Sequence, residues 1–310
     1  MAEQQVGVMI LQSGKASEAR PFFERALNSV KEINKTRNLS EEQLYEYSHL
    51  YSWYIRSLPD NTHLSLLYDT RQKQLELFKQ MESNVSRLIQ NQSEKLNVER
   101  AIVILLLNMG REDEAETLML SIQEQFKKLL QHDSENIGWR RHLMRSKLSL
   151  ARLQNKNNND IQRNQLLADV LSLQEKPDGG KWLVTTDISL GINRLSARKL
   201  YDEGFTQVAI ESLDKAEKAI RDYRKDKIRP RDKYNMASLN SLKAELYEKE
   251  GRISEASKTQ NYVLELLDGK DSYTLAEHKL KLRAYVSLKM RTEEMALREK
   301  FDNRGLVVSH

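Results

Sequence analysis

Cysteine is absent from the 310 residues of this chain, and proline (4 residues) and glycine (11 residues) are scarce. Without cysteine there is no disulfide framework, no thiolate metal ligand and no cysteine nucleophile. The shortage of proline and glycine argues against a turn-rich β protein. Leu, Ala, Glu, Lys, Arg and Gln dominate what remains, and all of them favour helices. The composition therefore predicts an almost wholly helical protein.

Long apolar runs are also missing. The longest, AIVILLL at residues 101–107, is far shorter than the roughly 20 residues that span a bilayer. The N-terminus shows no basic segment followed by an apolar stretch, so we expect no signal peptide. We expect a soluble protein without membrane insertion, in the cytoplasm, or in the periplasm if it belongs to a membrane-anchored protein. Because the chain opens directly in a repeat helix, we also expect that it can be part of a longer protein.

Neither positive nor negative charge is concentrated in one part of the sequence. The net charge of +5 comes from 50 basic and 45 acidic residues, whereas nucleic-acid binding usually comes with a concentrated basic stripe. The most basic stretch, Arg221–Lys233, has seven basic residues interleaved with three acidic ones. A solvated loop between repeats explains it better than a nucleic-acid patch, so the charge pattern argues against a nucleic-acid partner.

Motifs that carry chemistry are absent as well. The sequence has no glycine-rich phosphate loop and no GxSxG nucleophile turn. No two histidines stand four residues apart, so a helix-borne zinc pair is missing. The six histidines are scattered over positions His49, His63, His132, His142, His278 and His310. We therefore expect no enzyme activity, no cofactor and no metal site.

What the sequence does have is a repeated spacing. Residues 201–220, YDEGFTQVAIESLDKAEKAI, read as a helix end, a tight turn at Gly204 and a second helix with Ala209 on its first turn. Glycine closes the first helix at little cost, and alanine lets the two helices approach closely. The 5-4-3 stepping recurs, with Arg291 in the glycine place of the last copy: Gly14/Ala19/Phe23/Ala26, Gly110/Ala115/Met119/Ile122, Gly204/Ala209/Leu213/Ala216, Gly251/Ala256/Gln260/Val263 and Arg291/Ala296/Lys300.

The first helix of each pair supports this spacing. The residues twelve before the matched alanines are mostly small: Gly7, Val103, Ala197, Ala244 and Ala284. Small side chains at these places would allow paired helices to cross tightly. Stacked pairs of this kind stabilise each other through their neighbours.

These offsets resemble the tetratricopeptide repeat, most closely in Gly7/Gly14/Ala19/Phe23/Ala26 and Ala197/Gly204/Ala209/Leu213/Ala216, with Tyr247 at the family's aromatic place. The resemblance implies an all-α, right-handed superhelix of antiparallel helix pairs. The first helix of each pair would line a concave groove that binds peptides, often through acidic peptide ends. The family's proline after the second helix is missing, and a unit near 47 residues exceeds the usual length of about 34.

The spacing also predicts the domain organisation. The gaps from Gly14 to Gly110 and from Gly110 to Gly204 are about twice the gap from Gly204 to Gly251, so one degenerate unit is expected in each. The helices expected there cover 41–57, 63–90 with a break near Ser83, 137–153 and 160–174. Pro177–Gly180 is the clearest break. We expect repeats in 1–176 and in 181–310 that form one continuous solenoid.

The C-terminal half has a second resemblance. Its ending, LKMRTEEMALREKFDNRGL, resembles the last repeat of regions attached to larger bacterial signalling proteins such as kinases and winged-helix regulators. This resemblance implies a ligand-sensing portion that switches an attached domain.

The candidate site is the predicted groove. Its inward positions, counted from the matched alanines, include Gln4, Val8, Arg100, Ile104, Arg194, Arg198, Ser241, Glu245, Lys281 and Tyr285. Arg194 and Arg198 lie one turn apart on the same face, and two guanidiniums there could clamp a carboxylate or phosphate. The alternative is an internal ion pair with Asp202 or a neighbouring glutamate. The residues predicted to bind a partner are Arg194, Arg198, Arg100, Lys281 and Tyr285.

Two further stretches have a functional and a structural interpretation. The aromatic residues of Tyr45–Tyr54 could form a docking surface, but packing against the adjacent helix explains them better. The basic stretch Trp139–Arg145 could bind an acidic peptide or a phosphate, but a solvated helix start with Trp139 buried, whose charges have a local acidic partner, explains it better.

We therefore expect a non-catalytic scaffold that binds a peptide or helix of another protein, and the arginines of the groove favour an acidic one. The first alternative is the regulatory portion of a larger bacterial kinase or winged-helix regulator, and the second is an RNA-binding helical repeat. The identity of the partner and the oligomeric state are left open by the sequence.

Overall fold

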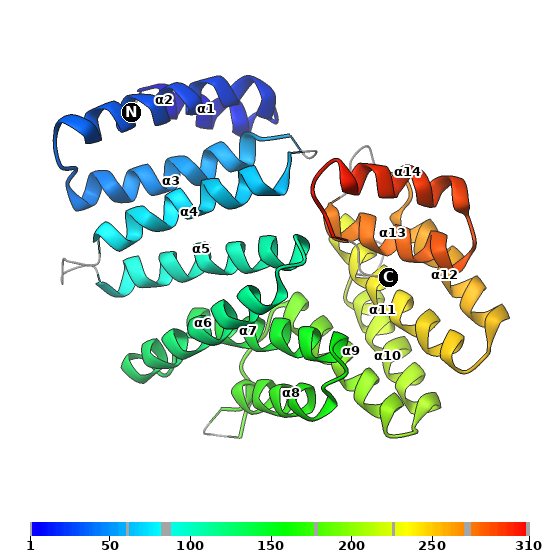
Figure 1. Ribbon diagram of the computed structural model, residues 1–310. Helices are drawn as coiled ribbons and strands as arrows, with labels where there is room; N and C mark the ends of the chain where they lie inside the picture. The colour runs from blue at the N-terminus through cyan, green and yellow to red at the C-terminus, as the bar shows by residue number, and fades with distance from the viewer. Residues whose placement is uncertain are drawn as a thin grey trace. The chain divides into compact units, whose positions relative to one another are not determined.

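The computed structural model describes residues 2–59, 62–81, 88–176, 179–224, 227–269 and 274–307. Within these ranges the regular structure is helical, apart from one isolated antiparallel bridge between Glu175 and Lys181. The prediction of an all-α fold built from consecutive helix pairs is confirmed (Figure 1). None of the described helices combines the length and the apolar character that crossing a bilayer requires.

The helices in chain order are α1 (Ala2–Gln12), α2 (Ala16–Thr36), α3 (Glu41–Ser57), α4 (Leu64–Met81), α5 (Leu88–Asn108), α6 (Glu112–His132), α7 (Ile137–Lys156), α8 (Asp160–Gln174), α9 (Thr186–Asp202), α10 (Thr206–Arg224), α11 (Pro230–Lys249), α12 (Ile253–Leu267), α13 (Leu275–Ser287) and α14 (Arg291–Asp302). The helix expected over 63–90 is therefore two helices, α4 and α5. The break expected near Ser83 lies outside the described residues.

The chain divides into two compact units. Unit 1 comprises Met1–Gln125 and Lys300–His310, and unit 2 comprises Phe126–Glu299. The division falls within α6 and, near the end of the chain, within α14. The boundary expected between residues 176 and 181 lies inside unit 2, between α8 and α9. Two residues of that expected break, Pro177 and Asp178, lie outside the described residues.

Unit 1 contains the helix pairs α1/α2, α3/α4 and α5/α6. Gly7 shows why the first pair needs a small residue, because a Cβ there would lie 2.8 Å from the buried ring of Phe23. The unit also takes in the last residues of the chain. The backbone N–H of Leu64 donates to the carbonyl of Arg304 (2.9 Å), and that of Val307 donates to the carbonyl of Asn108 (2.9 Å).

Unit 2 contains four consecutive helix pairs that begin with α7, α9, α11 and α13. The first helices α7, α9 and α11 each pack against their own partner and against the first helix of the next pair. The core between α9, α10 and α11 is built from small and aliphatic side chains, including Ala197, Ala209, Leu213 and Leu242. We call the surface formed by α7, α9, α11 and α13 the first-helix face.

A residue in the left-handed backbone region precedes the second helix of six pairs by two positions. The six residues are Gly14, Gly110, Asn158, Gly204, Gly251 and Lys289, with φ between 57° and 86°. Four of them are the glycines that the sequence predicted. Asn158 supplies the turn of the pair α7/α8, which the sequence identified only as degenerate, and asparagine is among the residues that tolerate this conformation.

The predicted helix contacts are confirmed in four of the five copies. Ala19, Ala115 and Ala209 have no exposed surface, and Ala256 is 2% exposed. In the last copy the assignment was wrong, because Ala296 is exposed to solvent while Leu297 and Phe301 are buried. The cause is a shift of two residues: Lys289, not Arg291, occupies the glycine place.

The turn at Lys289 gives a stability prediction. A residue with a Cβ pays about 1–2 kcal/mol to adopt the left-handed conformation, and glycine removes most of that strain. We expect Lys289→Gly to raise the free energy of unfolding by about 0.5–1 kcal/mol, measured by urea denaturation. Lys215→Gly, in the exposed middle of α10, should lower it by about 1 kcal/mol. Equal losses in both variants would show that Lys289 is not strained.

Candidate functional site

The left-handed residues define equivalent positions on the first-helix face of unit 2. The position six residues before each of them carries a charged side chain in all four pairs. These side chains are Arg152 on α7, Arg198 on α9, Glu245 on α11 and Arg283 on α13. One turn earlier on α9 lies Arg194. We call Arg152, Arg194, Arg198, Arg283 and Glu245 the arginine cluster, in which two of the four guanidiniums bind the one carboxylate.

Glu245 is the anionic centre of the cluster. Arg198 donates to its Oε1 and Arg283 donates to its Oε2, while Nζ of Lys249 lies 3.7 Å from Oε1. Burial alone would raise the pKa of Glu245, but the positive charges of Arg283 and Arg198 hold it below its usual value. Glu245 is therefore ionised at neutral pH, and both of its oxygens are engaged inside the protein.

Arg194 is the unbalanced member of the cluster. Its Nε is buried and has no hydrogen-bond partner, and Arg194 forms no ion pair with any residue that the structure describes. Burial, together with the positive charges of Arg152 and Arg283, lowers the pKa of Arg194 to about 10. The side chain stays charged at neutral pH. Unit 2 therefore holds a guanidinium whose Nε is shielded from water and has no protein hydrogen-bond partner in its place.

Arg152 faces the same region from the preceding helix. A Cβ on Gly191 of α9 would lie 3.0 Å from Nη2 of Arg152, so the missing side chain of Gly191 makes room for the guanidinium. The Arg152 side chain keeps exposed surface, and the groups packed around its guanidinium lower its pKa by desolvation. Among the described residues it has no hydrogen-bond or ion-pair partner. The nearby carboxylate of Asp187 is already bound by Arg145, whose Nε lies 2.7 Å from its Oδ2.

Positive charge continues along the face beyond the arginine cluster. Lys279 on α13 is equivalent to Arg194 on α9, since each lies ten residues before the left-handed residue of its pair. Burial lowers the pKa of Lys279, and the positive charge of Lys156 on α7 adds to this effect. The first-helix face therefore carries more positive than negative charge from α7 to α13.

The predicted site residues are placed as follows. Arg198 forms an internal ion pair, as the alternative interpretation held, but with Glu245; Asp202 instead accepts from the buried Arg163 on α8 (2.6 Å). Arg198 is therefore not free to clamp a ligand together with Arg194. The charge of Arg194 is instead close to that of Arg152. Arg152 was missed because its pair has asparagine, not glycine, at the turn.

The other predicted partner-binding residues lie either in unit 1 or two residues away from the equivalent positions of the last helix pair. The shift of two residues in the last pair puts Lys279 and Arg283, not Lys281 and Tyr285, at the positions equivalent to Arg194 and Arg198. Arg100 belongs to unit 1, where its Nη1 lies 3.5 Å from Oδ1 of Asn97. No finding tests whether these residues bind a partner, so that prediction stands as a prediction.

The two other stretches have local partners. In the basic stretch, Arg145 pairs with Asp187, and Arg141 donates to the backbone carbonyl of Leu183 (2.7 Å). In the aromatic stretch, Tyr47 is buried, and its ring centroid lies 5.2 Å from that of Tyr51. The contacts of the basic stretch agree with its structural interpretation. The ring contact lies within α3 and does not test whether the aromatic residues pack against the adjacent helix.

Within the described ranges, no three His, Asp or Glu side chains gather where they could hold a metal ion.

No protein-family model matches the sequence, and no curated protein matches it significantly.

Proposed function

We propose that unit 2 binds an acidic segment of another protein on its first-helix face and acts as a non-catalytic interaction module. The observation that carries this proposal is the charge of Arg194, which is half-buried and has no anionic partner of its own. An unpaired charge in such a place costs the free protein stability. An anion that binds there removes this cost, and guanidiniums suit carboxylates because they donate two parallel hydrogen bonds.

The extent of the positive face favours a peptide over a small anion. Charged positions recur on α7, α9, α11 and α13, and each of these helices packs against the next one in the series. Packed helices lie about 8–10 Å apart, so the four positions cover up to about 25–30 Å. An extended chain advances about 3.3 Å per residue. A segment of about eight residues would therefore be long enough to extend from α7 to α13, with its carboxylates facing the guanidiniums and not Glu245.

The repeat pattern adds support. The resemblance to the tetratricopeptide repeat implies peptide recognition by the first helices, and the arginine cluster lies on those helices. Membership of that family remains part of the proposal. The regulatory alternative would use the same face, with the bound peptide switching an attached domain.

Binding can be tested with a charge-matched pair of variants. Arg152→Gln/Arg194→Gln removes two positive charges from the first-helix face, and Lys215→Gln/Lys218→Gln removes two from exposed positions on α10. We expect a short fluorescent peptide rich in glutamate to bind the wild type and the α10 variant equally. The Arg152/Arg194 variant should bind about a hundredfold more weakly or worse. The measurement is fluorescence anisotropy.

Two controls make this test decisive. The same peptide with glutamine in place of glutamate should not bind, and raising the salt concentration should weaken binding of the acidic peptide. If both double variants lose affinity equally, the interaction reflects net charge and the proposed site is wrong. If single-stranded RNA binds the same face more tightly than the peptide, the face is a nucleic-acid site and the peptide proposal fails.

A further inference from the structure

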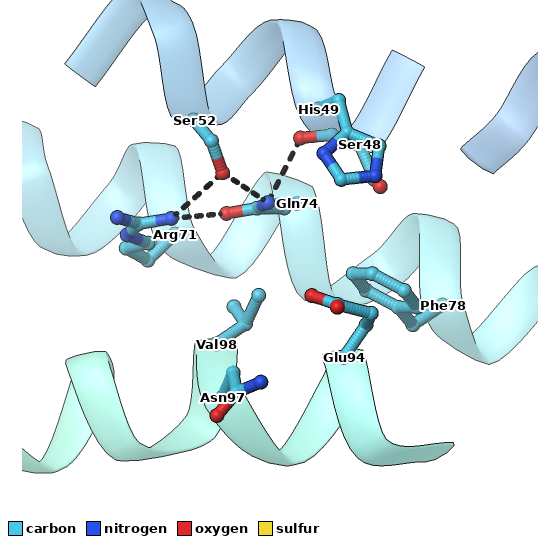
Figure 2. Close-up of a pocket in the computed structure, with 9 residues that line it drawn as sticks. All are labelled: Ser48, His49, Ser52, Arg71, Gln74, Phe78, Glu94, Asn97 and Val98. Atoms are coloured by element: carbon cyan, nitrogen blue, oxygen red, sulfur yellow. Dashed lines mark hydrogen bonds between the residues drawn. The ribbon is translucent and has the colours of Figure 1, made fainter. Parts of the chain in front are cut away.

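Unit 1 contains a polar cavity that the proposed function does not use. Its volume is about 170 Å³, more than ten times the roughly 10–15 Å³ that a single water needs by the same measure. Side chains from α3, α4 and α5 surround it (Figure 2): Ser48, His49, Ser52, Arg71, Gln74, Phe78, Glu94, Asn97 and Val98. Several of them are only half-buried, so solvent can enter.

One wall is a fixed guanidinium. The buried Gln74 donates to the carbonyl of Ser48 (2.8 Å) and to Oγ of Ser52 (2.9 Å), and its Oε1 accepts from Nη1 of Arg71 (2.6 Å). Nη1 also lies 3.3 Å from Oγ of Ser52. These bonds hold Arg71 in place but use only Nη1. Arg71 has no carboxylate partner among the residues that the structure describes.

The facing wall carries the opposite charge. Glu94 projects from α5 toward α4, between Phe78 and Val98 (Figure 2). Its carboxylate is half-buried and forms no hydrogen bond or ion pair within the described part of the chain. Arg71 and Glu94 thus line one cavity without pairing with each other. Half-buried charges without an oppositely charged partner are costly, so a ligand that supplies one to each would be stabilised on both sides.

We propose that this cavity binds a small zwitterion, a free α-amino acid, with its carboxylate on Arg71 and its ammonium group on Glu94. A simple anion would leave Glu94 unpaired and be repelled by it, and a simple cation would meet the same difficulty at Arg71. The apolar side chains of Phe78 and Val98 would contact the ligand's side chain. This inference is independent of the peptide site, because it involves no residue of unit 2.

The test is a thermal-unfolding screen of the whole chain with single free amino acids. At least one should raise the melting temperature. Its N-acetyl derivative, which lacks the ammonium group, and its methyl ester, which lacks the carboxylate, should not. Glu94→Gln and Arg71→Gln should each weaken the affinity about tenfold or more, while Glu46→Gln and Lys73→Gln, which change exposed charges on α3 and α4, should leave it unchanged.

Three outcomes would overturn the proposal. These are stabilisation by no amino acid, equal stabilisation by either derivative, and unchanged affinity in Glu94→Gln. If Arg71→Gln does not fold, the derivatives and Glu94→Gln still decide the matter. Failure of the amino-acid test would leave the peptide proposal intact, because the peptide experiment measures binding to unit 2.

Discussion

Glu245→Gln should lower the free energy of unfolding of unit 2 by about 3–5 kcal/mol. The carboxylate of Glu245 is 15% exposed and is the anion that Arg198 and Arg283 share. Glutamine keeps the shape but removes the charge, so four guanidiniums would repel one another without a counterion. Urea denaturation followed by tryptophan fluorescence can measure this loss, because Trp139 and Trp182 both lie in unit 2.

A matched control and a suppressor sharpen this prediction. Glu203→Gln, at the residue that follows α9, removes the partner of Lys199 in an exposed pair, and the expected loss is below about 1 kcal/mol. Adding Arg194→Met to Glu245→Gln should restore part of the stability, because it removes one of the repelling charges. If Glu245→Gln behaves like Glu203→Gln, or if the second change lowers stability further, the cluster is not electrostatically strained.

The pH dependence follows from the same carboxylate. The pKa of Glu245 is lower in the folded protein than in the unfolded chain. Its contribution to stability is therefore fully present above the unfolded pKa and is lost as the pH falls through the folded pKa. The acid-side loss of stability of unit 2 should accordingly be smaller in Glu245→Gln than in the wild type.

Arg163→Ala is the second large effect, and here the repeat pattern and the structure disagree. Arg163 lies five residues after Asn158, the place that Ala209 occupies after Gly204. The pattern alone would predict that alanine fits better. In the structure, the side chain of Arg163 is 1% exposed and donates through Nη1 to Asp160 (2.8 Å), Asn155 (3.1 Å) and Asp202 (2.6 Å).

We therefore expect Arg163→Ala to cost about 3–5 kcal/mol, because it leaves a cavity and removes the cation from two carboxylates. Lys215→Ala, an exposed change on α10, should stay within about 0.5 kcal/mol of the wild type. The measurement is again denaturation followed by tryptophan fluorescence. A neutral or stabilising Arg163→Ala would mean that the alanine pattern governs this pair and that the polar contacts contribute nothing.

These cases show what could be predicted from the sequence. Helix pairs, glycine turns and buried alanines follow from local chemistry, so the turns at Gly204 and Gly251 and the burial of Ala209 could be predicted. Asn158 could have been found too, because it lies about one unit from both neighbouring turns and has Ala151 seven residues before it, as Gly204 has Ala197. Recognising that pair would have put Arg152 on the candidate face.

Other features depend on distant parts of the chain. Arg163 is buried with a local carboxylate, that of Asp160, and a distant one, that of Asp202 on the next first helix. Lys289 can occupy a glycine place because a backbone penalty of about 1–2 kcal/mol is small against the packing of the last pair. Whether Arg194 is paired depends on side chains of three other helices. The residue pattern of a single helix therefore cannot predict whether Arg194 is paired.

The most direct test of the account is the single variant Arg194→Met, with stability and peptide affinity measured in the same buffer. The Nε of Arg194 is buried without a hydrogen-bond partner, and this burial also lowers the pKa of Arg194, so its charge costs the free protein stability. We predict that Arg194→Met raises the free energy of unfolding by about 1–3 kcal/mol and weakens binding of the glutamate-rich peptide about tenfold or more. A variant that is less stable than the wild type, or that binds the peptide equally well, would contradict the claim that unit 2 keeps this charge for an anionic partner.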